Sequence, residues 1–172
     1  MIIRPATESD IPAVAAIKVE SWRHAYRGLV PDAVLDAMTP DQVRRQWLDI
    51  DVTRFAASVL VADREDGVAG YAMFGPMRDA APGYDGQLYA IYLRPAAMRS
   101  GIGGALFRAA SESLRAQGRA NFLLWVFEAN AAARRFYERQ GGSLIPGAHV
   151  VTEIGGAHLP ELAYGFPATG AV

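Results

Sequence analysis

The chain of 172 residues carries 17 Lys and Arg against 18 Asp and Glu, is 51% hydrophobic and contains no cysteine. A net charge of −1 argues against a general nucleic-acid-binding protein, which needs a basic face. Without cysteine the chain has no disulfide, no thiolate metal site and no cysteine nucleophile. Its length fits one domain, which we expect over residues 1–166, followed by a flexible tail over residues 167–172.

Targeting and metal-binding patterns are missing from the sequence. No run approaches the 18 apolar residues of a membrane span, and the N-terminal residues 1–5 do not have the form of a signal peptide. We therefore expect a cytoplasmic protein with no membrane partner. His24, His149 and His158 lack the spacing of metal ligands, so no metal is expected.

Capping residues and hydrophobic periodicity divide the first part of the chain into elements. Pro5 restricts the first strand to a sheet edge. In chain order we expect an edge strand over residues 1–5, a helix capped by Ser9 or Asp10 and running to about residue 27, a short helix over residues 30–38, and a helix opened by a capping box at residues 39–42.

Apolar runs separated by glycine-containing turns continue the pattern. Two hairpins and a strand–helix–strand–helix unit together predict a mixed α/β sheet. The expected elements are strands over residues 57–63 and 68–77, a loop over 79–86, a strand over 88–93, a helix over 101–117, a strand over 121–128, a helix capped by Asn130, and a hairpin of residues 143–153 and 157–166.

A glycine-rich segment follows the apolar strand at residues 88–93. Gly101, Gly103 and Gly104 lack the Cβ atoms that would hold a ligand away from the backbone. The free N–H groups of the first helical turn and the helix dipole favour anions, above all phosphates. The segment therefore predicts a phosphate-binding site.

The glycines allow a dinucleotide-binding interpretation. Gly101-Ile-Gly103 begins like the dinucleotide fingerprint, and Glu128 follows near the roughly 20-residue spacing of a ribose-binding acid. However, Leu106 stands where the third Gly or Ala belongs, and the seven residues 94–100 separate the strand from the glycines. A dinucleotide-binding protein is therefore the less favoured alternative.

Two motifs at a defined separation give a second interpretation. Met98-Arg-Ser-Gly-Ile-Gly-Gly104 and Asn130-Ala-Ala-Ala-Arg-Arg-Phe-Tyr-Glu-Arg-Gln-Gly141 resemble the two motifs of the GCN5-related N-acetyltransferase (GNAT) family. The resemblance implies an α/β fold with a mostly antiparallel central sheet, flanked by helices, in which two neighbouring parallel strands splay apart. Those strands would be residues 87–93 and 121–128.

The same resemblance implies that acetyl-CoA lies in the gap between the two strands. Met98 occupies a position that is Gln or Arg in the family; because backbone amides bind the pyrophosphate, we expect weaker affinity rather than none. The implied cofactor-binding residues are Ile91, Tyr92 and Leu93 for the pantetheine, Arg99, Ser100, Gly101, Ile102, Gly103 and Gly104 for the pyrophosphate, and Asn130 and Tyr137.

Transfer of an acetyl group from a thioester to an amine needs an acid for the leaving thiolate. Tyr137 matches the family's tyrosine and lies two helical turns beyond Asn130, so it is the expected acid. The alternative is that Phe136 and Tyr137 form only a buried aromatic pair. A Lys-like amine is on the order of 0.1% free base at pH 7, so the reaction also needs a base or a dry pocket.

The base is less clear from the sequence. Many relatives carry Glu where this chain has Gln87, which cannot take a proton. Glu128 is the nearest carboxylate in the sequence and the named candidate, against the alternative of a solvated acid at the end of a strand. Tyr89, His158 or a water chain stay open.

The acceptor site and the reaction complete the hypothesis. Trp22 and Tyr26 resemble a helical corner that walls the acceptor pocket in one acetyltransferase subgroup, with core packing as the alternative, and Tyr89 joins them as a substrate-binding candidate. We expect an acetyl-CoA-dependent N-acetyltransferase that acetylates a primary amine of a small molecule or peptide by direct attack. A non-catalytic CoA-binding module is the alternative, and a homodimer stays open.

Overall fold

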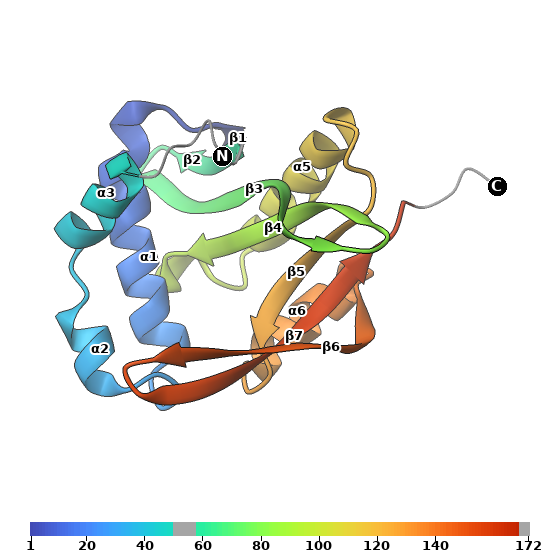
Figure 1. The fold of residues 1–172 in the computed structure, drawn as a ribbon. Coiled ribbons are helices and arrows are strands. Elements are labelled where there is room, and N and C mark those ends of the chain that lie inside the picture. The colour runs from blue at the N-terminus through green and yellow to red at the C-terminus, as the bar shows by residue number, and fades with distance from the viewer. Residues whose placement is uncertain (50–57, 169–172) are drawn as a thin grey trace.

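The computed structural model describes residues 1–49 and 58–168. Residue 57, the predicted start of a strand, and residues 169–172, most of the predicted tail, lie outside this range. The described strands form one seven-stranded sheet in the order β1-β2-β3-β4-β5-β7-β6 (Figure 1). Their bounds are β1 Ile2–Pro5, β2 Ser58–Arg64, β3 Gly67–Ala81, β4 Tyr84–Leu93, β5 Phe122–Phe127, β6 Ser143–Ile154 and β7 Ala157–Phe166.

Helices cover both faces of the sheet. Side chains alternate along β3, so Tyr71 and Met73 pack with α1 (Ile11–Ala25), whereas Ala72 and Phe74 pack in the larger core with α5 (Ile102–Ala116). None of the helices in the described ranges is long and apolar enough to cross a membrane. The α-helices are α1 Ile11–Ala25, α2 Asp32–Ala37, α3 Pro40–Asp49, α5 Ile102–Ala116 and α6 Ala131–Arg139, with 3-10 turns at Glu8–Asp10 and Pro95–Ala97.

The two central strands pair only briefly. β4 and β5 are parallel, and their register consists of Gly86 with Phe122 and Gln87 with Leu123. All other pairings between neighbouring strands of the described sheet are antiparallel. The predicted mixed, mostly antiparallel sheet with one splayed parallel pair is therefore confirmed.

One predicted loop is wrong. Residues 79–86 were expected as a loop because of Pro82 and the glycines, but β3 continues to Ala81 and β4 begins at Tyr84. Gly83 has a φ of +84°, which allows a tight turn at this point. An irregularity between Pro76 and Ala81 interrupts the ladder, so the apolar pattern stops before the strand does.

The start of α1 depends on a buried carboxylate rather than on a simple cap. Asp10 precedes the helix but its side chain makes no capping bond to it. Its Oδ2 instead accepts hydrogen bonds from the Thr7 N–H at 2.8 Å and from Arg4 Nη1 at 2.7 Å. Arg4 Nε also binds Asp63 of β2 at 2.7 Å, so this network ties the beginning of α1 to the edge of the sheet.

We expect Asp10→Asn to lower the free energy of unfolding by about 1–3 kcal/mol at pH 7, since charge-assisted bonds are lost in a buried place. Hydrogen bonds from Arg4 hold the pKa of the Asp10 carboxyl far below its usual range, against the effect of burial. This stabilisation is present above the unfolded pKa of about 3.9 and is lost as the pH falls toward the folded pKa.

Urea unfolding of Asp10→Asn and wild type at several pH values from 7 to 3 measures this difference. The difference should shrink toward low pH. Asp85→Asn, at an exposed position in β4, is the control, and an equal loss in both variants would contradict the role of the network.

Candidate active site

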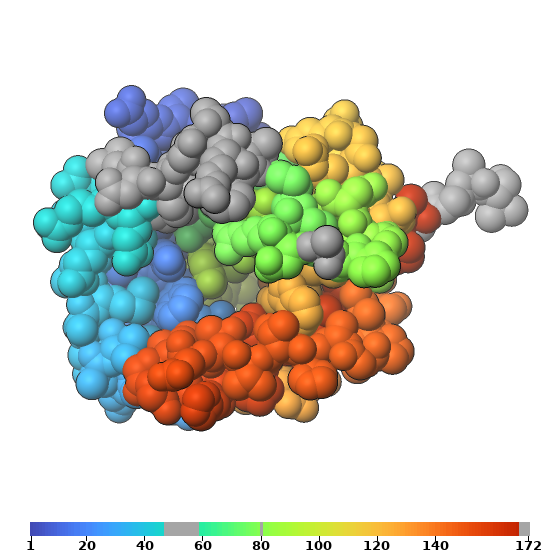
Figure 2. Space-filling model, viewed as in Figure 1, coloured from blue at the N-terminus to red at the C-terminus, as the bar shows by residue number. Residues whose placement is uncertain are grey.

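The parting of β4 and β5 opens a cavity of about 970 Å³. Its walls are β4, β5, α1, the β6–β7 hairpin, the beginning of α5 and one side of α6. Figure 2 shows the hollow between the blue α1, the green strands and the orange-red hairpin. Because β4 has no neighbour on this side beyond Gln87 within the described sheet, its backbone edge is available to a ligand.

The glycine-rich segment forms one end of the cavity. Gly101, Gly103 and Gly104 line it together with Arg99, and Gly101 has a φ of +85°. A Cβ atom at Gly103 would come to 3.5 Å from Leu93 and Phe136, and one at Gly104 would meet only Gln140 Oε1, at 3.9 Å. These glycines are therefore not required by tight packing, and their missing side chains leave room in the cavity.

Asn130 and Tyr137 enter the cavity from α6. Asn130 Oδ1 accepts the Ala133 N–H at 3.1 Å, as expected of a helix cap, and the residue also lines the cavity. Tyr137 lies 5.2 Å from Phe136 and 6.5 Å from Phe107 between ring centroids, and it too lines the cavity. Tyr137 thus belongs to an aromatic cluster and also faces the cavity.

Three tyrosines share the middle of the cavity: Tyr26, Tyr92 and Tyr137. Burial raises the pKa of each, and the nearby Tyr92 hydroxyl raises the pKa of Tyr26 and of Tyr137 further. Their phenol groups therefore stay protonated at neutral pH. Each can donate a proton or a hydrogen bond there.

Aromatic rings wall the end of the cavity next to α1. The rings of Trp22 and Tyr26 meet edge to face at 5.0 Å, and those of Tyr26 and Phe127 at 5.1 Å. Trp22 Nε1 is buried without a hydrogen-bond partner among the described residues, although the indole lies close enough to the Tyr92 hydroxyl to lower its pKa. An unpaired buried donor costs free energy, and a ligand in the cavity could accept its hydrogen bond.

The carboxylate in the cavity is Glu161 of β7, which the sequence analysis did not identify. Its charge raises the pKa of Tyr26 and of Tyr92, and its Oε1 accepts a hydrogen bond from Thr152 Oγ1. The signal was present in the sequence, because Glu161 is the sole acidic residue of an otherwise largely apolar strand.

The structure does not bring Glu128 into the cavity. Its side chain is exposed, and the residue is not among those that line the cavity. Gln87 is buried, and its Oε1 accepts the Arg78 backbone N–H at 3.2 Å, so it connects β3 and β4. Tyr89 lines the cavity, but its hydroxyl donates to the Pro76 carbonyl oxygen.

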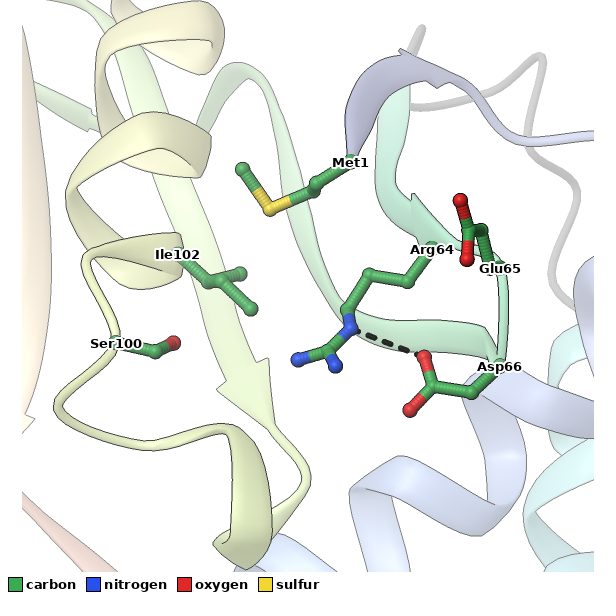
Figure 3. Close-up of a pocket in the computed structure, with 6 residues that line it drawn as sticks. All are labelled: Met1, Arg64, Glu65, Asp66, Ser100 and Ile102. Atoms are coloured by element: carbon green, nitrogen blue, oxygen red, sulfur yellow. Dashed lines mark ion pairs between the residues drawn. The ribbon is translucent and has the colours of Figure 1, made fainter.

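Two predicted cofactor-binding residues face a different hollow. Ser100 and Ile102 border a second space of about 660 Å³, together with Met1 and the β2–β3 turn (Figure 3). Ser100 Oγ donates to the Ala97 carbonyl oxygen at 2.6 Å, and Ile102 is buried. Their side chains therefore support the segment that carries the glycines.

Basic residues of α6 also belong to the site. Arg135 and Arg139 line the cavity. Arg134 Nε donates to the Tyr164 hydroxyl at 3.2 Å. Helical spacing alone could not place these charges, since the direction of α6 relative to β4 was unknown. All the other residues predicted to bind cofactor or substrate line the cavity: Trp22, Tyr26, Tyr89, Ile91, Tyr92, Leu93, Arg99, Gly101, Gly103, Gly104, Asn130 and Tyr137.

Comparisons with known proteins address the identity of this fold and cavity. The sequence pattern of the Acetyltransferase (GNAT) family matches residues 19–142. An uncharacterized N-acetyltransferase of Bacillus subtilis, YuaI, is 34% identical over 171 residues, which cover 99% of this chain and 95% of that protein.

Solved structures agree with the sequence matches. The ribosomal-protein-alanine N-acetyltransferase of Brucella melitensis has a TM-score of 0.76 at 28% identity, over 97% of this chain and 99% of that one. A putative acetyltransferase of Salmonella typhimurium, yncA, solved with its cofactor acetyl-CoA, has a TM-score of 0.72 at 22% identity, over 100% of this chain and 96% of that one. Fold, cavity and sequence together show that the chain belongs to the GNAT family of N-acetyltransferases.

Proposed function

We propose that the chain transfers an acetyl group from acetyl-CoA to a primary amine of a small molecule or peptide, by direct attack of the amine on the thioester. The observation that carries this proposal is the free backbone edge of β4, which runs along a cavity that ends at a glycine-rich helix start. Pantetheine bears amide groups and can pair with such an edge as an added strand does.

The residues present suit acetyl-CoA along the length of the cavity. Ile91, Tyr92 and Leu93 offer backbone groups to the pantetheine, and the N-terminal turn of α5 offers N–H groups to the pyrophosphate. Arg99, Arg135 and Arg139 also line the cavity, and they add positive charge that can attract phosphates. The Salmonella structure with acetyl-CoA bound supports this assignment by likeness of fold.

Tyr137 is the proposed acid for the departing thiolate. Its phenol is protonated at neutral pH because burial raises its pKa. Proton transfer from an ordinary phenol to a thiolate is uphill by about 2 kcal/mol, and the raised pKa of Tyr137 adds to this. Burial also destabilises a thiolate formed in the same place. Its protonation therefore becomes more favourable, which offsets part of the added free-energy cost.

Glu161 replaces Glu128 as the proposed base. A carboxylate in the cavity can attract the ammonium form of an acceptor and take a proton from it, directly or through water. Glu128 is exposed and outside the cavity lining, so it has no direct route to the acceptor. The presence of both an acid and a base in the cavity favours catalysis over a non-catalytic CoA-binding module. Dimerisation and a cytoplasmic location stay predictions.

Gly101→Val should weaken acetyl-CoA binding at least tenfold, because a β-branched side chain at positive φ distorts the helix start that holds the phosphates. Calorimetric titration with acetyl-CoA measures the change. Gly118→Val is the matched control: its φ is +77°, it has equally open surroundings, and it lies at the other end of α5. Both variants should lose about 1–2 kcal/mol of stability, and equal acetyl-CoA affinities would contradict the proposed phosphate site.

Tyr137→Phe should lower kcat by about a hundredfold, which is a usual loss for a general acid, while the Kd for acetyl-CoA stays unchanged. Thiol release from acetyl-CoA in the presence of an amine panel measures turnover. Tyr84→Phe, a tyrosine outside the cavity lining, should be neutral. Wild-type turnover in Tyr137→Phe would remove this residue from the mechanism.

Glu161→Gln should remove the acidic limb from the pH profile of kcat/KM, because the amide cannot accept a proton. Glu128→Gln should keep that limb, and the two substitutions make the same chemical change at different places. Steady-state kinetics from pH 5 to 9 test the pair. Loss of the limb in Glu128→Gln alone would show that the assignment of the base from the structure is wrong.

A further inference from the structure

We propose that Lys18 and Arg78 form an anion-binding subsite beside the cavity, and that the acetylated amine also carries a carboxylate, as an amino acid does. This inference rests on the proposed function and names the acceptor class that the proposed function leaves open. It arises from cations that the mechanism does not use.

Both cations lie over rings that line the cavity. Lys18 Nζ is 5.8 Å from the centroid of Trp22, which follows one turn later in α1. Arg78 Cζ is 4.3 Å from the centroid of Tyr89 in β4. Trp22 and Tyr89 are two of the three aromatic residues predicted to contact the acceptor, and both border the cavity. The two positive charges therefore flank the acceptor end of the site.

Lys18 and Arg78 repel one another, and neither charge is neutralised by an ion pair with a described residue. The pKa of Lys18 is lowered, first by burial and then by the charge of Arg78. Arg4, Arg27 and Arg94 form ion pairs with carboxylates. Across residues 1–49 and 58–168, by contrast, neither Lys18 nor Arg78 has an ion-pair partner. An anion bound between them would be attracted by both.

The cavity also holds a negative charge, that of Glu161. The charges of Glu161 and Arg78 both act on the Tyr92 hydroxyl, because Glu161 raises its pKa and Arg78 lowers it. Tyr92 therefore lies within electrostatic reach of a carboxylate and of a guanidinium. An acceptor with an ammonium group toward Glu161 and a carboxylate toward Arg78 and Lys18 matches this distribution of charge. An acceptor with amines alone would bring a positive end to a positive surface.

Matched acceptors test the proposal. We would measure kcat/KM, by thiol release from acetyl-CoA, for L-amino acids and for the corresponding amino-acid amides, which differ in one charge. The wild type should prefer the acids roughly tenfold or more, as charge-assisted contacts suggest. In Lys18→Met and Arg78→Gln this preference should fall toward one, with an unchanged Kd for acetyl-CoA.

Arg115→Gln is the control, since Arg115 is exposed in the last turn of α5, away from the cavity. Lys18→Arg should retain the preference, because it keeps the charge. A wild type that prefers the amides, or a preference for the acids that survives in both Lys18→Met and Arg78→Gln, would overturn the proposal.

A binding measurement separates failure of this inference from failure of the proposed function. Calorimetry with the CoA-loaded protein compares N-acetyl-L-amino acids with N-acetyl-L-amino-acid amides, and needs no turnover. Tighter binding of the acids, lost in Arg78→Gln, would support the subsite even if no amine in the panel were acetylated. Equal binding of acids and amides would overturn the subsite, even if amines were acetylated.

Discussion

The separation of two parallel strands is the constraint on which the rest of this structure depends. β4 and β5 share a register only at Gly86–Phe122 and Gln87–Leu123, and the sheet continues through antiparallel partners on both outer sides. Backbone N–H and C=O groups inside a protein need hydrogen-bond partners, so the gap is suited to a ligand with amide groups. Helix α5 begins at this gap, with Gly101, Gly103 and Gly104 in the cavity lining, and its N-terminus favours phosphates.

The chemistry proposed for the cavity follows from burial and from a few charges. Burial keeps the phenols of Tyr26, Tyr92 and Tyr137 protonated, which suits donation to a leaving group and excludes phenolates as bases near neutral pH. Glu161 supplies the negative charge beside them. The same aromatic packing that stabilises the core around Phe107 holds Tyr137 in place, so its structural and proposed chemical roles support one another.

Local chemistry explains what the sequence could predict. Asn130 caps α6 and Gly101 opens α5, because caps and glycines act on their immediate neighbours. Glu161, Arg135 and Arg139 were missed since their approach to the cavity depends on how distant strands and helices pack. Glu128 was chosen by proximity in the sequence, yet the chain turns into α6 immediately afterwards and leaves its side chain exposed. Likewise, the sequence pattern could not show that Ser100 and Ile102 border the second hollow rather than the cavity between β4 and β5.

Amide hydrogen exchange with and without acetyl-CoA shows whether the cofactor occupies the gap between β4 and β5. We expect the N–H groups of residues 88–93 that face the gap, and those of the first turn of α5, to become protected when acetyl-CoA is added, because they then have partners. The edge strand β1, far from the gap in the sheet order, should be unchanged. Binding of acetyl-CoA without protection in β4 would show that the donor lies outside the gap between the two strands.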